Sequence, residues 1–191
     1  VMIRGECLQY AAGTVRAARS VVIEAVRKDG LSLQFVAEDL KADEEIVFEA
    51  VKQCGSSMEY AAPSLKSDPA FVPKAVEAGG NALRYVNKAL VDRELVLAAV
   101  RSEGFAFGWA SDFHGDREIA LEAVRNNGEA FAFASDELKA DKEIVGTAAR
   151  SFAPAIEEAG DVLKKDKDFL WSCVQANPNN LEYVGALVTE D

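Results

Sequence analysis

The feature of this sequence that most restricts its fold is a motif of about 25 residues that recurs along the whole chain. An Ala-Val pair marks each copy, and the steps between successive pairs are 25, 25, 24, 24, 25 and 25 residues. Self-similarity at such a period is typical of short structural units that stack into an array. The pairs are Ala25-Val26, Ala50-Val51, Ala75-Val76, Ala99-Val100 and Ala123-Val124, followed by the altered forms Ala148-Ala149 and Cys173-Val174.

Each copy carries the signals of a helix that begins at an aspartate. An Asp side chain can accept hydrogen bonds from the free N–H groups of a first helical turn. In the copy that begins at Asp116, the apolar residues Ile119, Ala120, Ala123 and Val124 share one face of a helix. A Gly four residues after the Val predicts the end of that helix. The aspartates are Asp43, Asp68, Asp92, Asp116, Asp141 and Asp166, with Ala18 in the first copy, and the glycines are Gly30, Gly55, Gly80, Gly104 and Gly128.

A second helix of about ten residues is predicted after the Gly. Apolar side chains stand three, six and ten residues beyond it, as Phe131, Ala134 and Leu138 do in one copy and Leu181 and Val184 do in the last. These offsets trace one helical stripe. Helices this short are marginal alone in water, so their stripes must be buried by stacking on neighbouring copies. A leucine-rich repeat is excluded because no L-x-L strand with an Asn or Cys ladder stands at fixed register.

The predicted fold is therefore all-α, an α-solenoid-like array of helix–turn–helix repeats of about 24–25 residues. We expect one array over residues 1–191, with a partial repeat at 1–17 and Asp191 opening the next. The chain then begins and ends inside a repeat, which suggests part of a longer array. Pro63 is predicted to shorten or kink a second helix, and Pro73 to bend a first helix. The full repeats are 18–42, 43–67, 68–91, 92–115, 116–140, 141–165 and 166–190.

The copies that follow Asp92 and Asp116 resemble a known repeat. The runs 92–100 and 116–141 are similar to the repeat called domain of unknown function 4116. The resemblance extends over nearly the whole chain and is weakest from 151 to 160 and at Asn177-Pro178. It implies an α-helical array, and it implies no activity, substrate or cofactor, because none is assigned to that family.

The net charge indicates which kinds of partner this chain can bind, and the cysteine content indicates the cellular compartment that suits it. The net charge of -11 and a pI near 4.7 argue against nucleic acid, which requires a basic footprint. They also disfavour an anionic membrane surface, and no apolar run is long enough for membrane insertion. A basic protein partner is compatible with this charge. Cys7, Cys54 and Cys173 lie far apart, which predicts unpaired thiols and favours an intracellular setting over secretion.

No arrangement of residues in the sequence predicts catalysis. Signatures for nucleophilic serine hydrolases, phosphate-binding loops, zinc proteases and dinucleotide binding are missing. His114 is the only histidine, whereas a histidine-based metal site needs several converging ligands. An acidic column has one carboxylate per repeat, which suits favourable first-turn charge better than a cation site. We therefore expect no enzyme, cofactor or metal. The column is Glu45, Glu94, Glu118, Glu143 and Asp168.

An aromatic column is the most informative candidate for binding. It stands five residues after the Gly position and comprises Tyr10, Phe35, Tyr60, Tyr85, Trp109, Phe133 and Tyr183. Such a column can form wedges between repeats or one wall of a binding groove. In the crowded copy near Gly104, Phe107 and Phe113 are expected in the core. Phe105, Trp109 and the neighbouring His114 are the candidate partner-binding residues.

Two functional hypotheses follow from an array without catalytic residues. The first is a non-catalytic protein–protein interaction scaffold, or a structural or linker subunit of a larger assembly, which binds through an extended helical surface. The second is the repeat region of a larger multidomain effector or enzyme whose catalytic domain lies outside these residues. A catalytic motif elsewhere in the full-length sequence would favour the second hypothesis.

Overall fold

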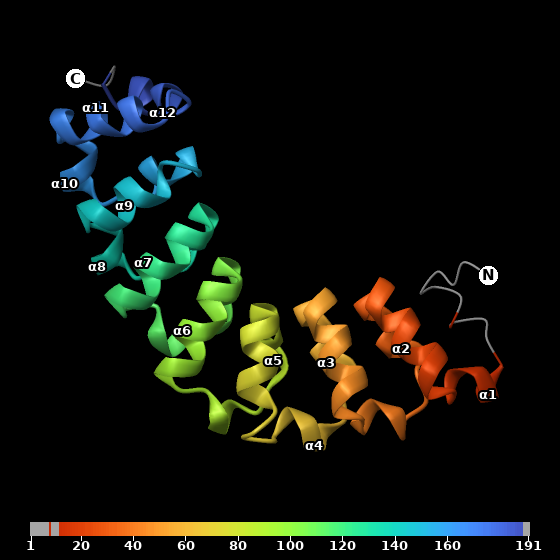
Figure 1. Cartoon of the computed structure of the whole chain (residues 1–191). Coiled ribbons are helices and arrows are strands. Elements are labelled where there is room, and N and C mark those ends of the chain that lie inside the picture. Colours follow the sequence, from red (N-terminus) through yellow and green to blue (C-terminus); the bar gives the residue numbers. More distant parts are fainter. Residues whose placement is uncertain (1–7, 9–11, 189–191) are drawn as a thin grey trace. The chain divides into compact units, whose positions relative to one another are not determined.

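The computed structural model describes residue 8 and residues 12–188, and this described part consists of helices joined by turns, without strands (Figure 1). The chain divides into two compact units, an N-terminal unit (residues 1–102) and a C-terminal unit (residues 103–191). The predicted all-α array of short tandem helices is confirmed.

The N-terminal unit alternates longer α-helices with short helical segments. The first helices of its repeats are α2, α3, α5 and α6, and the segments between them are mostly 3-10 helices, labelled η. The bounds are α1 Gly13–Arg16, α2 Arg19–Lys28, η2 Gly30–Phe35, η3 Leu40–Ala42, α3 Glu44–Gln53, η4 Gly55–Tyr60, α4 Pro63–Lys66, α5 Val72–Ala78, η5 Gly80–Tyr85, η6 Lys88–Leu90 and α6 Arg93–Ser102.

The C-terminal unit continues the same alternation. Its first helices are α7, α9 and α11, and the segment after α11 is an α-helix instead of a 3-10 helix. The bounds are η7 Gly104–Trp109, η8 Ser111–Phe113, α7 Arg117–Asn126, η9 Gly128–Phe133, α8 Asp136–Lys139, α9 Lys142–Ala148, η10 Ala153–Ile156, α10 Asp161–Lys164, α11 Lys167–Ala176 and α12 Asn180–Val188.

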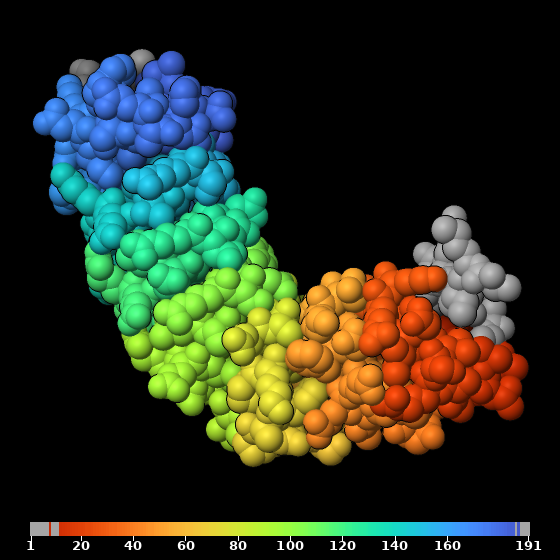
Figure 2. Space-filling model, in the orientation of Figure 1, coloured from red at the N-terminus to blue at the C-terminus, as the bar shows by residue number. Residues whose placement is uncertain are grey.

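Within each unit the repeats stack in sequence order. In the N-terminal unit, α2, α3, α5 and α6 form one row, and η2, η4 and η5 form a second row (Figure 1). In the C-terminal unit, α7 packs on α9, and η9 packs on both η7 and η10. Figure 2 shows successive repeats in each unit as adjacent bands of colour. Each helix thus buries its apolar stripe on its neighbours in the chain, as expected for repeats that are not stable alone.

The aspartate caps form as predicted. The Asp116 carboxylate accepts hydrogen bonds from the backbone N–H groups of Glu118 (3.0 Å) and Ile119 (3.2 Å). A cap of this kind stabilises a helix by about 1 kcal/mol. The predicted stripe of α7 is buried, because Ile119, Ala120, Ala123 and Val124 are at most 1% exposed.

The predicted second helix of about ten residues is wrong. In most copies a 3-10 helix of six residues begins at the Gly, and a separate short helix follows it, as η9 and α8 do. A 3-10 helix has about 3.0 residues per turn, so residues at offsets of three and six lie on one face. Gly128, Phe131 and Ala134 have these offsets, and all three are buried.

The predicted helix ends at the glycines are confirmed, because α3 ends at Gln53 and α7 at Asn126, two residues before Gly55 and Gly128. These glycines are needed for a different reason than a left-handed helix end. No Gly among the described residues has a positive φ. A Cβ atom on Gly128 would instead lie 2.5 Å from Ser151 Oγ and 2.8 Å from the carbonyl oxygen of Ala148, in the next repeat. A Cβ on Gly30 would meet the carbonyl oxygen of Ala50. Gly is required because consecutive repeats approach each other closely at these points.

Both proline predictions are wrong in detail. Pro63 neither shortens nor kinks a helix: η4 and α4 have the same lengths as η9 and α8, and Pro63 is the first residue of α4, where a missing N–H costs no intrahelical hydrogen bond. Pro73 does not bend α5. It lies in the first turn of a helix that begins only at Val72 and has 7 residues, whereas α3 and α6 have 10.

Two predicted core residues are not buried. Leu181 is 58% exposed, although Phe107 and Phe131 at the same register are fully buried. The difference arises because α12 is an α-helix, and Asn180 is buried with its side-chain amide donating to the carbonyls of Ala149 (3.1 Å) and Cys173 (2.8 Å). Phe113 is half-buried, whereas the prediction for Phe107 is confirmed.

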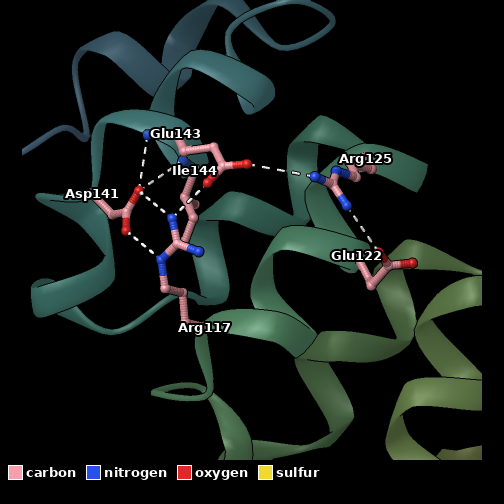
Figure 3. Close-up of polar contacts among 6 residues, drawn as sticks. All are labelled: Arg117, Glu122, Arg125, Asp141, Glu143 and Ile144. Carbon is pink, nitrogen blue, oxygen red and sulfur yellow. Dashed lines mark hydrogen bonds and ion pairs between the residues drawn. The ribbon is translucent and has the colours of Figure 1, made fainter.

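Two residues of the acidic column, Glu45 and Glu143, form ion pairs with an arginine of the preceding repeat. Arg117 Nε binds Asp141 Oδ2 (2.7 Å) and Arg117 Nη2 binds Glu143 Oε2 (2.6 Å), and Figure 3 shows this contact beside the Arg125–Glu122 pair. Arg19 makes the same contacts to Asp43 and Glu45 in the N-terminal unit. We call this contact the arginine bridge. In it, an arginine that directly follows the cap position of one repeat binds two carboxylates of the next repeat: the cap aspartate and the glutamate two residues after it.

The arginine bridge changes the titration of its cap. The hydrogen bond from Arg117 is the main cause that holds the pKa of Asp141 below its ordinary value of 3.8. The bond from Arg19 lowers the pKa of Asp43 in the same way. The carboxylate at each bridge is therefore held in its charged form by a positive group of the preceding repeat.

Candidate protein-interaction surface

The candidate residues Phe105 and Trp109 both lie on η7, the first helix of the C-terminal unit. The side chain of Phe105 is 40% exposed and that of Trp109 is 41% exposed. Gly104, Ala106 and Phe107 on the same helix are buried. The short helix therefore directs one face into the core and holds the two large rings at the surface. We call Phe105 and Trp109 the aromatic surface.

Phe105 is supported by a ring from the next repeat. Its ring makes an edge contact with Phe133 of η9, with centroids 5.1 Å apart and an interplanar angle of 82°. The Phe133 ring also lies against Gly108, since a Cβ added there would be 2.8 Å from its Cζ atom. Edge-to-face pairs of this kind contribute about 0.5–1.5 kcal/mol beyond their buried area. Phe105 is thus exposed on one side and fixed in orientation on the other.

Sequence reasoning missed the part played by Gly108. The residue four positions after the Gly is Gln34, Glu59, Arg84 or Ala132 in other copies, and it is Gly only here. A side chain at this place would occupy the space of the Phe133 ring. The signal available in the sequence was therefore this substitution by Gly within an aromatic-rich copy.

His114 belongs to the support of the aromatic surface. Its Nε2 lies 3.0 Å from the carbonyl oxygen of Phe107, and because a carbonyl only accepts, Nε2 carries the proton. Its ring is 5.0 Å from that of Phe107 and 6.2 Å from that of Phe133, measured between centroids. The side chain is half-buried. The structure therefore brings His114 together with Phe107 and with Phe133, the ring that supports Phe105.

The sequence left open whether the aromatic column packs between repeats or lines a binding surface, and its members differ in this respect. Its described members other than Trp109 are half-buried, whereas Trp109 is exposed. Tyr10 lies outside the described residues. The column therefore contributes packing between repeats, and Trp109 is its member with the largest surface available to a partner. The half-buried members are Phe35, Tyr60, Tyr85, Phe133 and Tyr183.

The chemistry of this surface is that of apolar and aromatic contact. Phenyl and indole rings offer large, rigid contact areas with little rotamer entropy to lose. Among the described residues, no group of three or more His, Cys, Asp or Glu side chains is placed to hold a metal ion. Cys54 and Cys173 are unpaired, and burial raises the pKa of the Cys173 thiol, which keeps it protonated. Cys7 lies outside the described part of the chain.

A membrane-spanning role finds no candidate segment in the described helices. None of them combines the length and the apolar character that a bilayer crossing requires.

Comparison with protein-family models matches this chain to the domain of unknown function (DUF4116). The match consists of five overlapping segments, at residues 19–66, 43–91, 92–139, 116–159 and 141–186. The overlap of consecutive segments agrees with a tandem repeat. No curated protein and no solved structure matches the chain in the corresponding comparisons.

Proposed function

We propose, from the premise that the chain belongs to the DUF4116 family, that it is a protein-binding scaffold without catalytic activity of its own. Stacked repeats present long continuous surfaces, and arrays of this kind commonly bind other proteins. As a subunit of a larger assembly, such a chain would hold a partner by its surface and leave the chemistry to other components.

The observation that supports this proposal most strongly is the exposure of Phe105 and Trp109. Tryptophan is enriched among the residues that dominate binding energy at protein interfaces. The two rings extend from a helix whose other face is buried, and Phe133 holds Phe105 in place. An exposed ring that is already held in place, as Phe105 is, loses little entropy when a partner covers it.

The test is a double variant, Phe105→Ala with Trp109→Ala, in the full chain. Wild-type protein carrying an affinity tag is purified with its bound proteins, the partner is identified by mass spectrometry, and its Kd is measured by calorimetry. We expect the double variant to bind at least about tenfold more weakly, as for loss of interface hot spots. We also expect only a modest fall in its Tm, because the edge contact of Phe105 with Phe133 is lost but neither ring is fully buried.

The matched control is Trp171→Ala, which removes another exposed ring, 60% exposed, from α11 of the same unit. This variant should keep the wild-type Kd. Unchanged binding by the double variant would contradict the proposal for this surface. A large drop in its Tm would show that the rings stabilise the fold instead.

A further inference from the structure

A groove of about 320 Å³ lies between α5 and α6 in the N-terminal unit. Its apolar part includes Val72, Pro73, Leu95 and Ala98, and Glu77, Asp92 and Glu94 also line it. No basic residue is among the described residues that line the groove. The groove thus combines an apolar surface with three carboxylates. Its other lining residues are Pro69 and Leu90.

Two features of the repeat register explain why this groove is open. Ala98 stands six residues after its cap. Two other copies have a glutamate at this position: Glu49 pairs with Arg27, and Glu122 pairs with Arg125. The short helix α5 begins only at Val72 because of the turn that contains Pro69. Small side chains and a missing helical turn therefore leave space between α5 and α6. A pocket at the same register lies between α9 and α11, but it is lined by the basic residues Lys142 and Arg150, and Lys142 pairs with Asp166.

The same register shows what the groove lacks. Asp92 and Glu94 correspond to Asp43 and Glu45 and to Asp141 and Glu143, the carboxylate pairs of the two arginine bridges. In those bridges, Arg19 or Arg117 stands directly after the preceding cap. At the corresponding position the chain has Pro69, which itself lines the groove.

The carboxylates that line the groove can accept further hydrogen bonds from a ligand. Asp92 caps α6 through one oxygen, which accepts from the backbone N–H of Leu95 (2.8 Å). Within the described part of the chain, neither Glu77 nor Glu94 takes part in an ion pair. An arginine places a planar set of N–H donors against such carboxylates and rests its methylene stem on apolar surface.

We propose that this groove binds an arginine side chain of a protein partner, which takes the place that Arg19 and Arg117 occupy at the arginine bridges. The guanidinium lies against Asp92 and Glu94, Glu77 adds a third negative charge, and the stem covers Val72, Leu95 and Ala98. The net charge of -11 attracts a basic segment to the chain. This site is separate from the aromatic surface and does not depend on it.

The test uses the whole chain, labelled with ¹⁵N, and a blocked pentapeptide that carries one arginine between small residues. Amide shifts are followed by NMR as the peptide is added. We expect saturable shifts confined to residues 69–77 and 92–98. A peptide with citrulline, which has the same shape without the charge, should bind about tenfold more weakly, as for loss of a charge-assisted hydrogen bond. A lysine peptide should also bind more weakly, because it lacks the planar fork.

Two variants distinguish a specific site from general attraction between charges. Pro69→Arg supplies the missing arginine from the chain itself and should abolish peptide binding, while Gln175→Arg adds the same charge at an exposed position of α11 and should not. Glu94→Gln should weaken binding about tenfold, whereas Glu44→Gln, an exposed residue outside the groove, should leave it unchanged.

The proposal is overturned by any of three results. These are an absence of saturable shifts, equal affinity for the arginine and citrulline peptides, or unchanged binding to Pro69→Arg. Equal affinity for lysine would replace the arginine-specific site by a general cation site and contradict the assignment. If Pro69→Arg does not give a folded spectrum, Glu94→Gln and its control decide the outcome.

Discussion

Two junctions between repeats, one in each unit, show how the same scaffold is used in different ways. At the junction of α7 and α9, Arg117 binds Asp141 and Glu143 (Figure 3). At the junction of α5 and α6, the register is the same but Pro69 replaces the arginine, and a groove remains. Both junctions keep the aspartate cap and the buried Ala-Val pair. Stability therefore rests on the positions that repeat, and both binding sites that we propose lie where a copy departs from the pattern.

The largest effect is expected from the glycines that repeats in both units share. Gly55→Ala and Gly128→Ala each place a Cβ within 3 Å of backbone or side-chain atoms of the next repeat. Overpacking of this kind costs about 1–3 kcal/mol, and we expect losses in this range from urea unfolding of both variants. Gly115→Ala is the control, because its added Cβ would have Ser135 Oγ at 3.9 Å as its nearest neighbour.

Equal stability of Gly128→Ala and Gly115→Ala would contradict the close approach of repeats at these glycines. A loss in Gly128→Ala without a loss in Gly55→Ala would show that only the C-terminal unit depends on it. Either result would remove the common basis on which the two junctions are compared.

The caps were predictable from the sequence, whereas the conformation after them was not. An Asp followed by apolar residues at helical spacing predicts the start of a helix, and α7 begins directly after Asp116. Offsets of three and six fit both a 3-10 helix and an α-helix, so Phe131 and Ala134 could not distinguish them. Gly128 has a similar ambiguity, because both a helix end and a close contact between repeats require Gly.

The candidate surface was only partly predictable. Aromatic crowding near Gly104 indicated Phe105 and Trp109, and both are exposed. The contact of Phe105 with Phe133 across the bare backbone of Gly108 joins two repeats, and no local pattern shows it. The groove at Pro69 could not be predicted from the sequence alone. Its prediction requires the structural fact that the residue after the cap of one repeat lies beside the cap of the next repeat.

A smaller effect separates the two junctions directly. Asn caps a helix about as well as Asp, so Asp→Asn removes the charge and keeps the cap. We expect Asp141→Asn to lose about 0.5 kcal/mol, as is typical of a partly exposed ion pair, because Arg117 loses its partner. Asp92→Asn should lose less, since no arginine stands at position 69.

Urea unfolding of both variants at low salt measures this difference. Equal losses would mean that the arginine bridge contributes nothing to stability. In 1 M salt the difference should shrink, because exposed charges are screened within a few ångströms.

The smallest effect concerns acid. Because arginine lowers the folded-state pKa of Asp43 and Asp141 below 3.8, their charge stabilises the folded chain fully above that pH. This contribution is lost as the pH falls through the lower folded-state pKa values. We expect the double variant Asp43→Asn with Asp141→Asn to lose less stability than wild type between pH 5 and about pH 2, as measured by urea unfolding. A loss equal to that of wild type would exclude these two carboxylates as a source of acid sensitivity.

A crystal structure of the Pro69→Arg variant tests the central comparison most directly. If the groove is an arginine bridge without its arginine, the new guanidinium will lie against Asp92 and Glu94, as Arg117 lies against Asp141 and Glu143. A new arginine side chain that points into solvent at this position, with the groove still open, would contradict this account.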